Sequence, residues 1–191
     1  MNKNRLEAFS DGVIAILITI MVLELRIPEG ADWAALRLIL PVFSTYVLSF
    51  VYLGIYWNNH HHLLQAATHV NGKVLWANLH LLFWLSLVPF VTGWMGHNHF
   101  ATLPTAMYGA VMFLSGVAYI ILEYALIGVE GPQSDLAKAV GKDPKEQISA
   151  VLLAAAIPLA FVNRWISGII YVGVVVMWLI PDPRIEARIK S

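Results

Sequence analysis

The sequence predicts an all-α integral membrane protein with six transmembrane helices in a single domain that covers residues 1–191. Three observations carry this prediction. Of the 191 residues, 59% are hydrophobic and only 13% are charged, and the mean hydropathy of +0.69 is too apolar for a soluble domain of this length. Apolar stretches of membrane-spanning length recur along the chain between polar turns. No internal sequence repeat divides the chain.

Charge and cysteine content exclude further classes of protein. The formal net charge is zero, which gives no reason to expect a nucleic-acid partner. The absence of cysteine excludes disulfides and thiolate chemistry. No small-residue cleavage site follows the first apolar run, so we expect this run to be a membrane span rather than a cleavable signal peptide.

The first span, residues 5–25, begins with a polar turn that leads directly into apolar sequence. Between Gly12 and Leu23 nothing is charged and only Thr19 is polar, so hydrocarbon or apolar protein can surround this part. Asp11 differs, because an ionised carboxylate near the membrane core costs about 2.5 to 3.5 kcal/mol. We therefore expect Asp11 to have a partner or to face water.

Helical geometry gives the first span two faces, because successive residues are about 100° apart. One face is a narrow aliphatic stripe, formed by Ile16, Ile20 and Leu23, extended by Phe9, Gly12 and Val13 and flanked by Thr19. Ser10 and Asp11 project about 120 to 140° away from this stripe. Periodicity alone favours lipid contact or packing for the stripe and a structural hydrogen-bonding role for Asp11.

The other spans follow in order, and we expect them at residues 36–64, 74–94, 104–127, 146–162 and 166–180. The second is longer than a bilayer needs, so its polar end projects past the hydrocarbon or packs inside a bundle. Pro89 predicts a kink in the third. Glu123, near the end of the fourth, could lie at the membrane interface or pair internally, and we expect it at the interface.

The connections between the later spans differ in length. The only long polar connection, residues 128–145, is expected to contain a short surface helix at 135–141. Residues 163–165 predict a tight hairpin between the fifth and sixth spans. Pro181 and Pro183 are expected to end the sixth span.

Lysine and arginine fall unevenly on the two sides that six spans define. One side has nine: Lys3, Arg5, Lys73, Lys138, Lys142, Lys145, Arg184, Arg188 and Lys190. The other side has three: Arg26, Arg37 and Arg164. Because cytoplasmic loops carry the excess of basic residues, both termini are predicted to be cytoplasmic.

Polar residues of three spans are expected at one depth in the membrane. The cytoplasmic halves of the second and third spans carry Trp57, His60, His61, His62 and Asn78, at the depth of Ser10 and Asp11. In hydrocarbon each of these groups needs a partner, and imidazole, indole and amide groups can supply one another and the carboxylate with hydrogen bonds. The sequence therefore predicts a polar hub behind the first span.

Two catalytic or metal-binding interpretations of these residues are less favoured. Three consecutive histidines point about 100° apart on a helix, so they do not converge on one ion. His69 or His80 could complete a metal site only by an arrangement that the sequence does not show. A triad of Ser10, His60 and Asp11 lacks a nucleophile elbow and an oxyanion site. We expect no enzyme activity, no metal and no cofactor.

The first span also carries a recognisable motif. Arg5, followed by Phe9-Ser10-Asp11, is similar to the R-x-x-x-F-S-D motif that opens the first helix of the transmembrane protein 175 family of potassium channels. Trp57, followed by His60-His61, resembles the family's W-x-x-H-H stretch, and Asn78 resembles a position in its third helix. The resemblance covers nearly the whole chain and is weakest in the fourth and fifth spans.

The resemblance implies a prokaryotic channel of the single-repeat type in the cell membrane, with K⁺ as the permeating ion. It implies a homotetramer in which the first helix of each copy lines a central pore. Ile16 is then the principal constriction, with Ile20 and Leu23 further outward, and Thr19 is the hydroxyl position that influences selectivity for K⁺ over Na⁺. Because an aliphatic ring offers no ligands to replace hydration water, we expect this selectivity to be modest.

Three other functions remain open from the residues. A proton-coupled carrier could use Asp11 and the histidines of the second span as a relay, because histidine titrates near neutral pH. An intramembrane enzyme would need a water-accessible nucleophile or a metal. A structural membrane subunit would have no permeation path.

Overall fold

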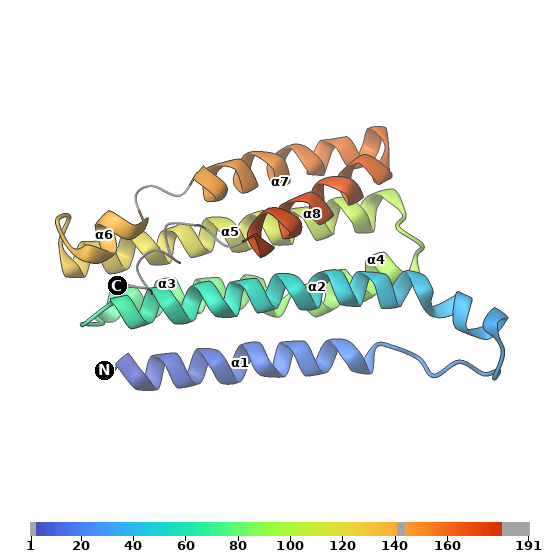
Figure 1. Cartoon of the computed structure of the whole chain (residues 1–191), viewed down its shortest axis with the longest axis horizontal. Coiled ribbons are helices and arrows are strands. Elements are labelled where there is room, and N and C mark those ends of the chain that lie inside the picture. The colour runs from blue at the N-terminus through green and yellow to red at the C-terminus, as the bar shows by residue number, and fades with distance from the viewer. Residues whose placement is uncertain (1–2, 141–143, 181–191) are drawn as a thin grey trace.

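The computed structural model describes residues 3–140 and 144–180 as an all-helical bundle (Figure 1). The helices in chain order are α1 (Lys3–Leu23), α2 (Trp33–Ala66), α3 (Gly72–Ser86), α4 (Val88–His97), α5 (Thr102–Glu130), α6 (Asp135–Val140), α7 (Pro144–Val162) and α8 (Arg164–Leu179). The expected helix end at Pro181 and Pro183 lies outside the described residues, as do the basic residues Lys142, Arg184, Arg188 and Lys190.

The long helices run side by side, with α1 along one side of the bundle and α7 and α8 along the other (Figure 1). α1 packs against α2, α3 and α4, whereas α5 packs against α3 and α7. The N-terminus of α1, the α2–α3 connection and α6 lie together at one end, here called the α2–α3 end. The opposite, α1–α2 end holds the α1–α2, α4–α5 and α7–α8 connections.

Most of the predicted spans appear as membrane-length helices. Within the described residues, five helical stretches are long and apolar enough to cross a membrane: α1, α2, α3 with α4, α5 and α7. The sixth predicted span, α8, has 16 residues, which corresponds to about 24 Å and is shorter than a hydrocarbon core of about 30 Å.

The third predicted span is two helices, because the α-helix is interrupted at Leu87, two residues before Pro89. Pro89 is the second residue of α4, a position where its missing N–H leaves no hydrogen bond broken. Leu87 keeps right-handed backbone angles, so α4 continues close to the direction of α3. The helix is therefore interrupted two residues before the proline that was expected to kink it.

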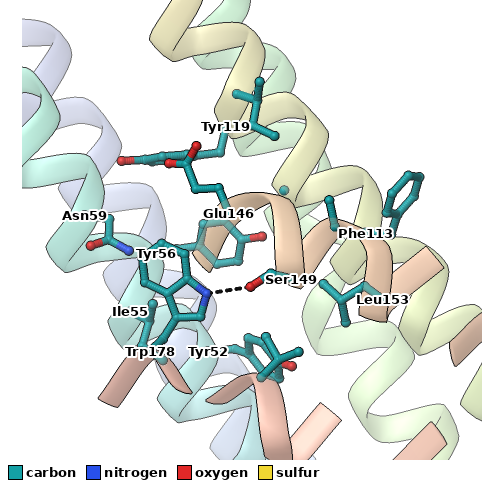
Figure 2. A pocket seen from close by; sticks show the side chains of 14 residues that line it. Tyr52, Ile55, Tyr56, Asn59, Phe113, Tyr119, Glu146, Ser149, Leu153 and Trp178 are labelled. Atoms are coloured by element: carbon teal, nitrogen blue, oxygen red, sulfur yellow. Dashed lines mark hydrogen bonds between the residues drawn. The ribbon is translucent and has the colours of Figure 1, made fainter. Parts of the chain in front are cut away.

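The α7–α8 hairpin is tighter than predicted, because only Asn163 lies outside the two helices. Its side chain caps α8 by accepting a hydrogen bond from the Trp165 N–H. Near the other end of the hairpin, Trp178 Nε1 donates to Ser149 Oγ at 2.8 Å, and the two side chains point toward each other (Figure 2). The hairpin is therefore fixed at both of its ends.

The position of Glu123 differs from the prediction. It was expected at the membrane interface, but its side chain is only 4% exposed. α5 continues for two further turns to Glu130, so position 123 lies inside the bundle, where α5 packs against α3 and α7. Packing of α5 against α3 and α7 therefore buries Glu123, and α5 ends at Glu130 instead of the predicted residue 127.

The α2–α3 connection is held from two sides. Lys3 Nζ donates to the Ala67 carbonyl at 3.0 Å. The carboxylate of Glu130, at the end of α5, accepts from the backbone N–H groups of Thr68 and His69 at 2.6 and 2.9 Å. These contacts link the start of α1 and the end of α5 to the connection that precedes α3.

Candidate functional site

The first helix has one face in the bundle and one face exposed. Its buried residues recur at helical spacing: Leu6, Ser10, Ile14, Leu17 and Met21. The exposed side carries what we call the aliphatic face, Ile16, Ile20 and Leu23, which are 57%, 42% and 79% exposed. Apolar side chains this exposed require lipid, a second protein surface or a dewetted pore around them.

Thr19 lies on the same exposed side of α1. Its hydroxyl donates to the Ile16 carbonyl at 2.8 Å. This bond uses the hydroxyl proton and leaves the oxygen available as an acceptor. The geometry therefore presents one oxygen beside the aliphatic face at the level of Ile16 and Ile20.

Behind the aliphatic face, a buried chain of hydrogen bonds connects three helices. Asn78 Nδ2 on α3 donates to Ser10 Oγ on α1 at 2.9 Å, and Asn78 Oδ1 lies 2.7 Å from His60 Nε2 on α2. The Ser10 hydroxyl in turn donates to the Leu6 carbonyl. All three side chains are fully buried. Since Asn78 Oδ1 is an acceptor only, His60 carries its proton on Nε2.

Asp11 and Trp57 form a direct contact between α1 and α2. Trp57 Nε1 donates to Asp11 Oδ1 at 3.0 Å. Asp11 is half-buried and Trp57 is partly exposed, so the carboxylate has both a partner and access to the surface. This satisfies the requirement that a charged group in a span be paired or wetted.

Sequence reasoning missed a further contact between α1 and α2. Glu7 Oε1 on α1 lies 3.0 Å from His61 Nδ1 on α2. His61 Nε2 is 2.8 Å from Gln65, and the His61 ring stacks on Trp57 with 6.0 Å between centroids. The spacing of Glu7 and Asp11, one helical turn apart, is the signal that could have placed Glu7 beside these residues.

We call these residues the polar cluster: Glu7, Ser10, Asp11, Trp57, His60, His61 and Asn78. The remaining motif residues, Arg5 and Phe9, lie exposed on α1 and make none of the cluster's hydrogen bonds. His62, the third adjacent histidine, is also exposed. Two residues of the motif on α1, Ser10 and Asp11, therefore contact the bundle, and the other two, Arg5 and Phe9, face outward.

The contacts of the polar cluster join α1 to α2 and α3. Among residues 3–140 and 144–180, no group of three or more histidine, aspartate or glutamate side chains converges as a metal site. A separate cavity of about 60 Å³ between α2, α5, α7 and α8 is lined by aromatic, aliphatic and a few polar side chains (Figure 2). No residue of the polar cluster lines this cavity.

Comparisons with known proteins agree with this architecture. A family model described as the endosomal/lysosomal potassium channel TMEM175 matches residues 5–89. A protein of Chryseobacterium sp. (strain P1-3), named as a potassium channel, is 54% identical over 191 residues, 100% of both chains. A protein of Streptomyces collinus, also named as a potassium channel, is 33% identical over 135 residues, 66% of each chain.

A solved structure shares the fold. The crystal structure of a lysosomal potassium-selective channel TMEM175 homolog from Chamaesiphon minutus matches with a TM-score of 0.79 and 22% sequence identity. The match covers 93% of this chain and 96% of that chain. Helix order and packing are therefore shared over nearly the whole length.

A bundle of apolar, membrane-length helices with a paired carboxylate inside its first helix defines an integral membrane protein that crosses the bilayer several times. The chain belongs to the TMEM175 family of ion channels. The all-helical class and the resemblance carried by the R-x-x-x-F-S-D motif are confirmed. Membership of a channel family also confirms that the chain is not an enzyme.

Proposed function

We propose that this chain is the subunit of a potassium-permeable channel in which copies of α1 line a central pore. One observation carries the proposal: α1 exposes an aliphatic face on the side opposite to the one that the bundle and the polar cluster hold. The whole-length relative named as a potassium channel supports potassium as the ion. One helix cannot enclose a path, so identical copies related by a cyclic axis are required, and we propose four.

The constriction is proposed to form from three layers of aliphatic side chains. Ile16 and Ile20 are about 6 Å apart along the helix axis, and Leu23 follows about 4.5 Å further. A narrow aliphatic ring closes a pore by dewetting, and conduction needs enough widening for a hydrated or partly hydrated ion. The Thr19 oxygen, the only polar side-chain atom between these layers, is proposed to favour K⁺ modestly over Na⁺.

The polar cluster is proposed to set the rotation of α1. Asp11 and Ile16 are five residues apart, which places them about 140° apart around the helix. Contacts of Ser10 and Asp11 with α2 and α3 therefore turn Ile16 away from the bundle. The orientation in which both termini are cytoplasmic stays part of this proposal and places the cluster near the cytoplasmic side.

The direct test is potassium flux into liposomes that contain the purified protein, paired with the mass of the detergent-solubilised complex. We expect passive potassium flux and a mass of four chains. A complex of the expected mass without flux contradicts the pore, whereas flux from a complex of another size contradicts only the tetramer.

A proton-coupled carrier is the second candidate, and the contact between Glu7 and His61 favours it, because a carboxylate 3.0 Å from an imidazole can exchange a proton with it. Such a carrier would show saturable uptake driven by a pH gradient and no single-channel currents. Single-channel currents in a bilayer at symmetrical pH decide for the channel.

A further inference from the structure

A groove at the α1–α2 end lies apart from the polar cluster and the aliphatic face. It encloses about 440 Å³ between α2, the α4–α5 connection and α8. Its walls are mainly apolar side chains, among them Leu48, Met95, Phe100, Ile169 and Val172. A groove of this volume and character can hold part of a hydrocarbon chain.

One cation lies at the groove. Arg164, the first residue of α8, lines it, and its guanidinium carbon is 5.5 Å from the centre of the Trp165 ring. No carboxylate of the described residues lies within 4.0 Å of this guanidinium. Trp165 is half-exposed and packs against Phe100, with 5.5 Å between ring centroids. Arginine and tryptophan in adjacent positions are typical of the level of lipid headgroups.

A second polar group of the groove lacks a partner. Thr105 lines the groove and is 1% exposed, and its hydroxyl has no hydrogen-bond partner in the described part of the chain. A buried hydroxyl without a partner costs free energy. The Thr105 hydroxyl lacks a hydrogen-bond acceptor among the described residues. A glycerolipid in the groove would carry such an acceptor near its headgroup, in its ester oxygens.

We infer that the groove is a binding site for one anionic phospholipid per chain. The phosphate pairs with Arg164 by charge-assisted hydrogen bonds, and an acyl chain lies along the apolar wall of α2 and α8. The apolar lining selects a lipid over free phosphate. α8 lies on the opposite side of the bundle from α1 (Figure 1), so copies that meet through α1 leave the groove open to the bilayer. This last point rests on the proposed function, and the binding test below does not.

The test is native mass spectrometry of the purified, full-length complex with added dioleoylphosphatidylglycerol. We expect one tightly bound lipid per chain. Arg164→Gln is expected to weaken binding about tenfold, which corresponds to about 1.4 kcal/mol, and Arg164→Lys to restore part of it. Arg37→Gln, which removes an exposed charge near the start of α2 and outside the groove, is the matched control and should bind normally.

A second pair of variants tests the acyl chain. A Cβ added at Gly168, which lines the groove, meets no atom within 4 Å. Gly168→Leu should therefore fill the groove without a clash and reduce lipid binding at least as much as Arg164→Gln. Gly173 lies on the same helix, is exposed and has equal space, and it does not line the groove. Gly173→Leu should leave binding unchanged.

Three results overturn the inference. Equal lipid binding by Gly168→Leu and Gly173→Leu shows that no acyl chain occupies the groove. Competition by soluble glycerol phosphate as effective as that by the lipid shows a simple anion site. Loss of the multi-subunit mass in Gly168→Leu, with lipid binding per chain unchanged, shows that another copy of the chain covers the groove. Lipid binding is measured without flux, so failure of this inference leaves the channel proposal standing.

Discussion

The indole N–H of Trp57 donates a hydrogen bond to the Asp11 carboxylate at 3.0 Å, and this bond joins α2 to α1. The same turn of α1 buries Ser10 against Asn78 of α3. Two adjacent residues thus contact two different helices, and together they fix both the depth and the rotation of α1. The aliphatic face points outward as a geometric consequence.

The pair of Asp11 and Trp57 should show energetic coupling. A hydrogen bond to a charged group contributes more than one between neutral groups, and here the partly exposed pair should contribute about 1 kcal/mol. In a double-mutant cycle, Asp11→Ala and Trp57→Phe should be non-additive by about this amount in thermal unfolding. Asp11→Asn keeps an acceptor oxygen and should cost less than Asp11→Ala. Additive effects of the two changes would show that the contact contributes nothing.

Asn78→Ala should destabilise the chain more than an ordinary surface change. Removing the amide leaves the buried imidazole of His60 without a partner on either ring nitrogen, which costs about 1 to 3 kcal/mol. The melting temperature should fall by roughly 4 to 8 °C for a loss of about 2 kcal/mol. Asn58→Ala, an exposed asparagine on α2, is the control, and an equal shift in both variants would contradict the buried network.

Ile16→Asn should raise potassium flux in liposomes. An amide in the proposed constriction keeps water in the pore, and a barrier lower by about 1.4 kcal/mol gives about tenfold more flux. Ile121→Asn, the same substitution at an exposed position of α5, should leave flux near the wild-type level. Equal flux from both variants would remove Ile16 from the pore.

Thr19→Val should reduce the preference for K⁺ over Na⁺, measured as a reversal potential under bi-ionic conditions. Valine keeps the shape but removes the hydroxyl oxygen beside the aliphatic face. We expect about a threefold loss in the permeability ratio, equivalent to about 0.6 kcal/mol. Thr19→Ser keeps the hydroxyl and should retain the preference. A ratio that follows side-chain volume instead of the hydroxyl would assign selectivity elsewhere.

Arg5→Ala should affect assembly and leave the subunit folded. Arg5 is exposed and has no hydrogen-bond or ion-pair partner among the described residues of its own chain, so we expect its partner in another copy. The fraction of full-mass complex should fall while the helical content by circular dichroism stays constant, and Arg5→Lys should restore part of it. A full-mass complex of unchanged yield would separate Arg5 from assembly.

Much of the fold can be predicted from the sequence of each helix taken alone. Apolar runs predict the positions of α1, α2, α5 and α7. A helix in a membrane must form all of its backbone hydrogen bonds within itself, and its apolar stretch is long enough to be recognised from the sequence. A kink was predicted at Pro89, and the helix is interrupted two residues earlier, at Leu87. Glu123 was misplaced because a carboxylate near the end of an apolar run is typical of the membrane interface, whereas the packing of α5 against α3 and α7 buries it.

The candidate site was predicted in part. Ser10, Asp11, Trp57, His60 and Asn78 were expected together because each polar group in a span needs a partner. The sequence could not say that Asn78 bridges Ser10 and His60 while Trp57 binds Asp11, and it missed Glu7 beside His61. Which donor meets which acceptor depends on the rotation and offset of neighbouring helices, and no single helix encodes these.

The sequence by itself determined that the chain crosses a membrane and that it carries the R-x-x-x-F-S-D motif. It also determined that the first helix has an aliphatic stripe, with Ser10 and Asp11 on another face. Periodicity and hydropathy are properties of each helix alone, so they can be read in one dimension. Tertiary structure decided which face of α1 is held in the bundle, and it brought Arg164 and Thr105 to one apolar groove. These features depend on contacts between helices distant in the sequence, and only packing in three dimensions creates them.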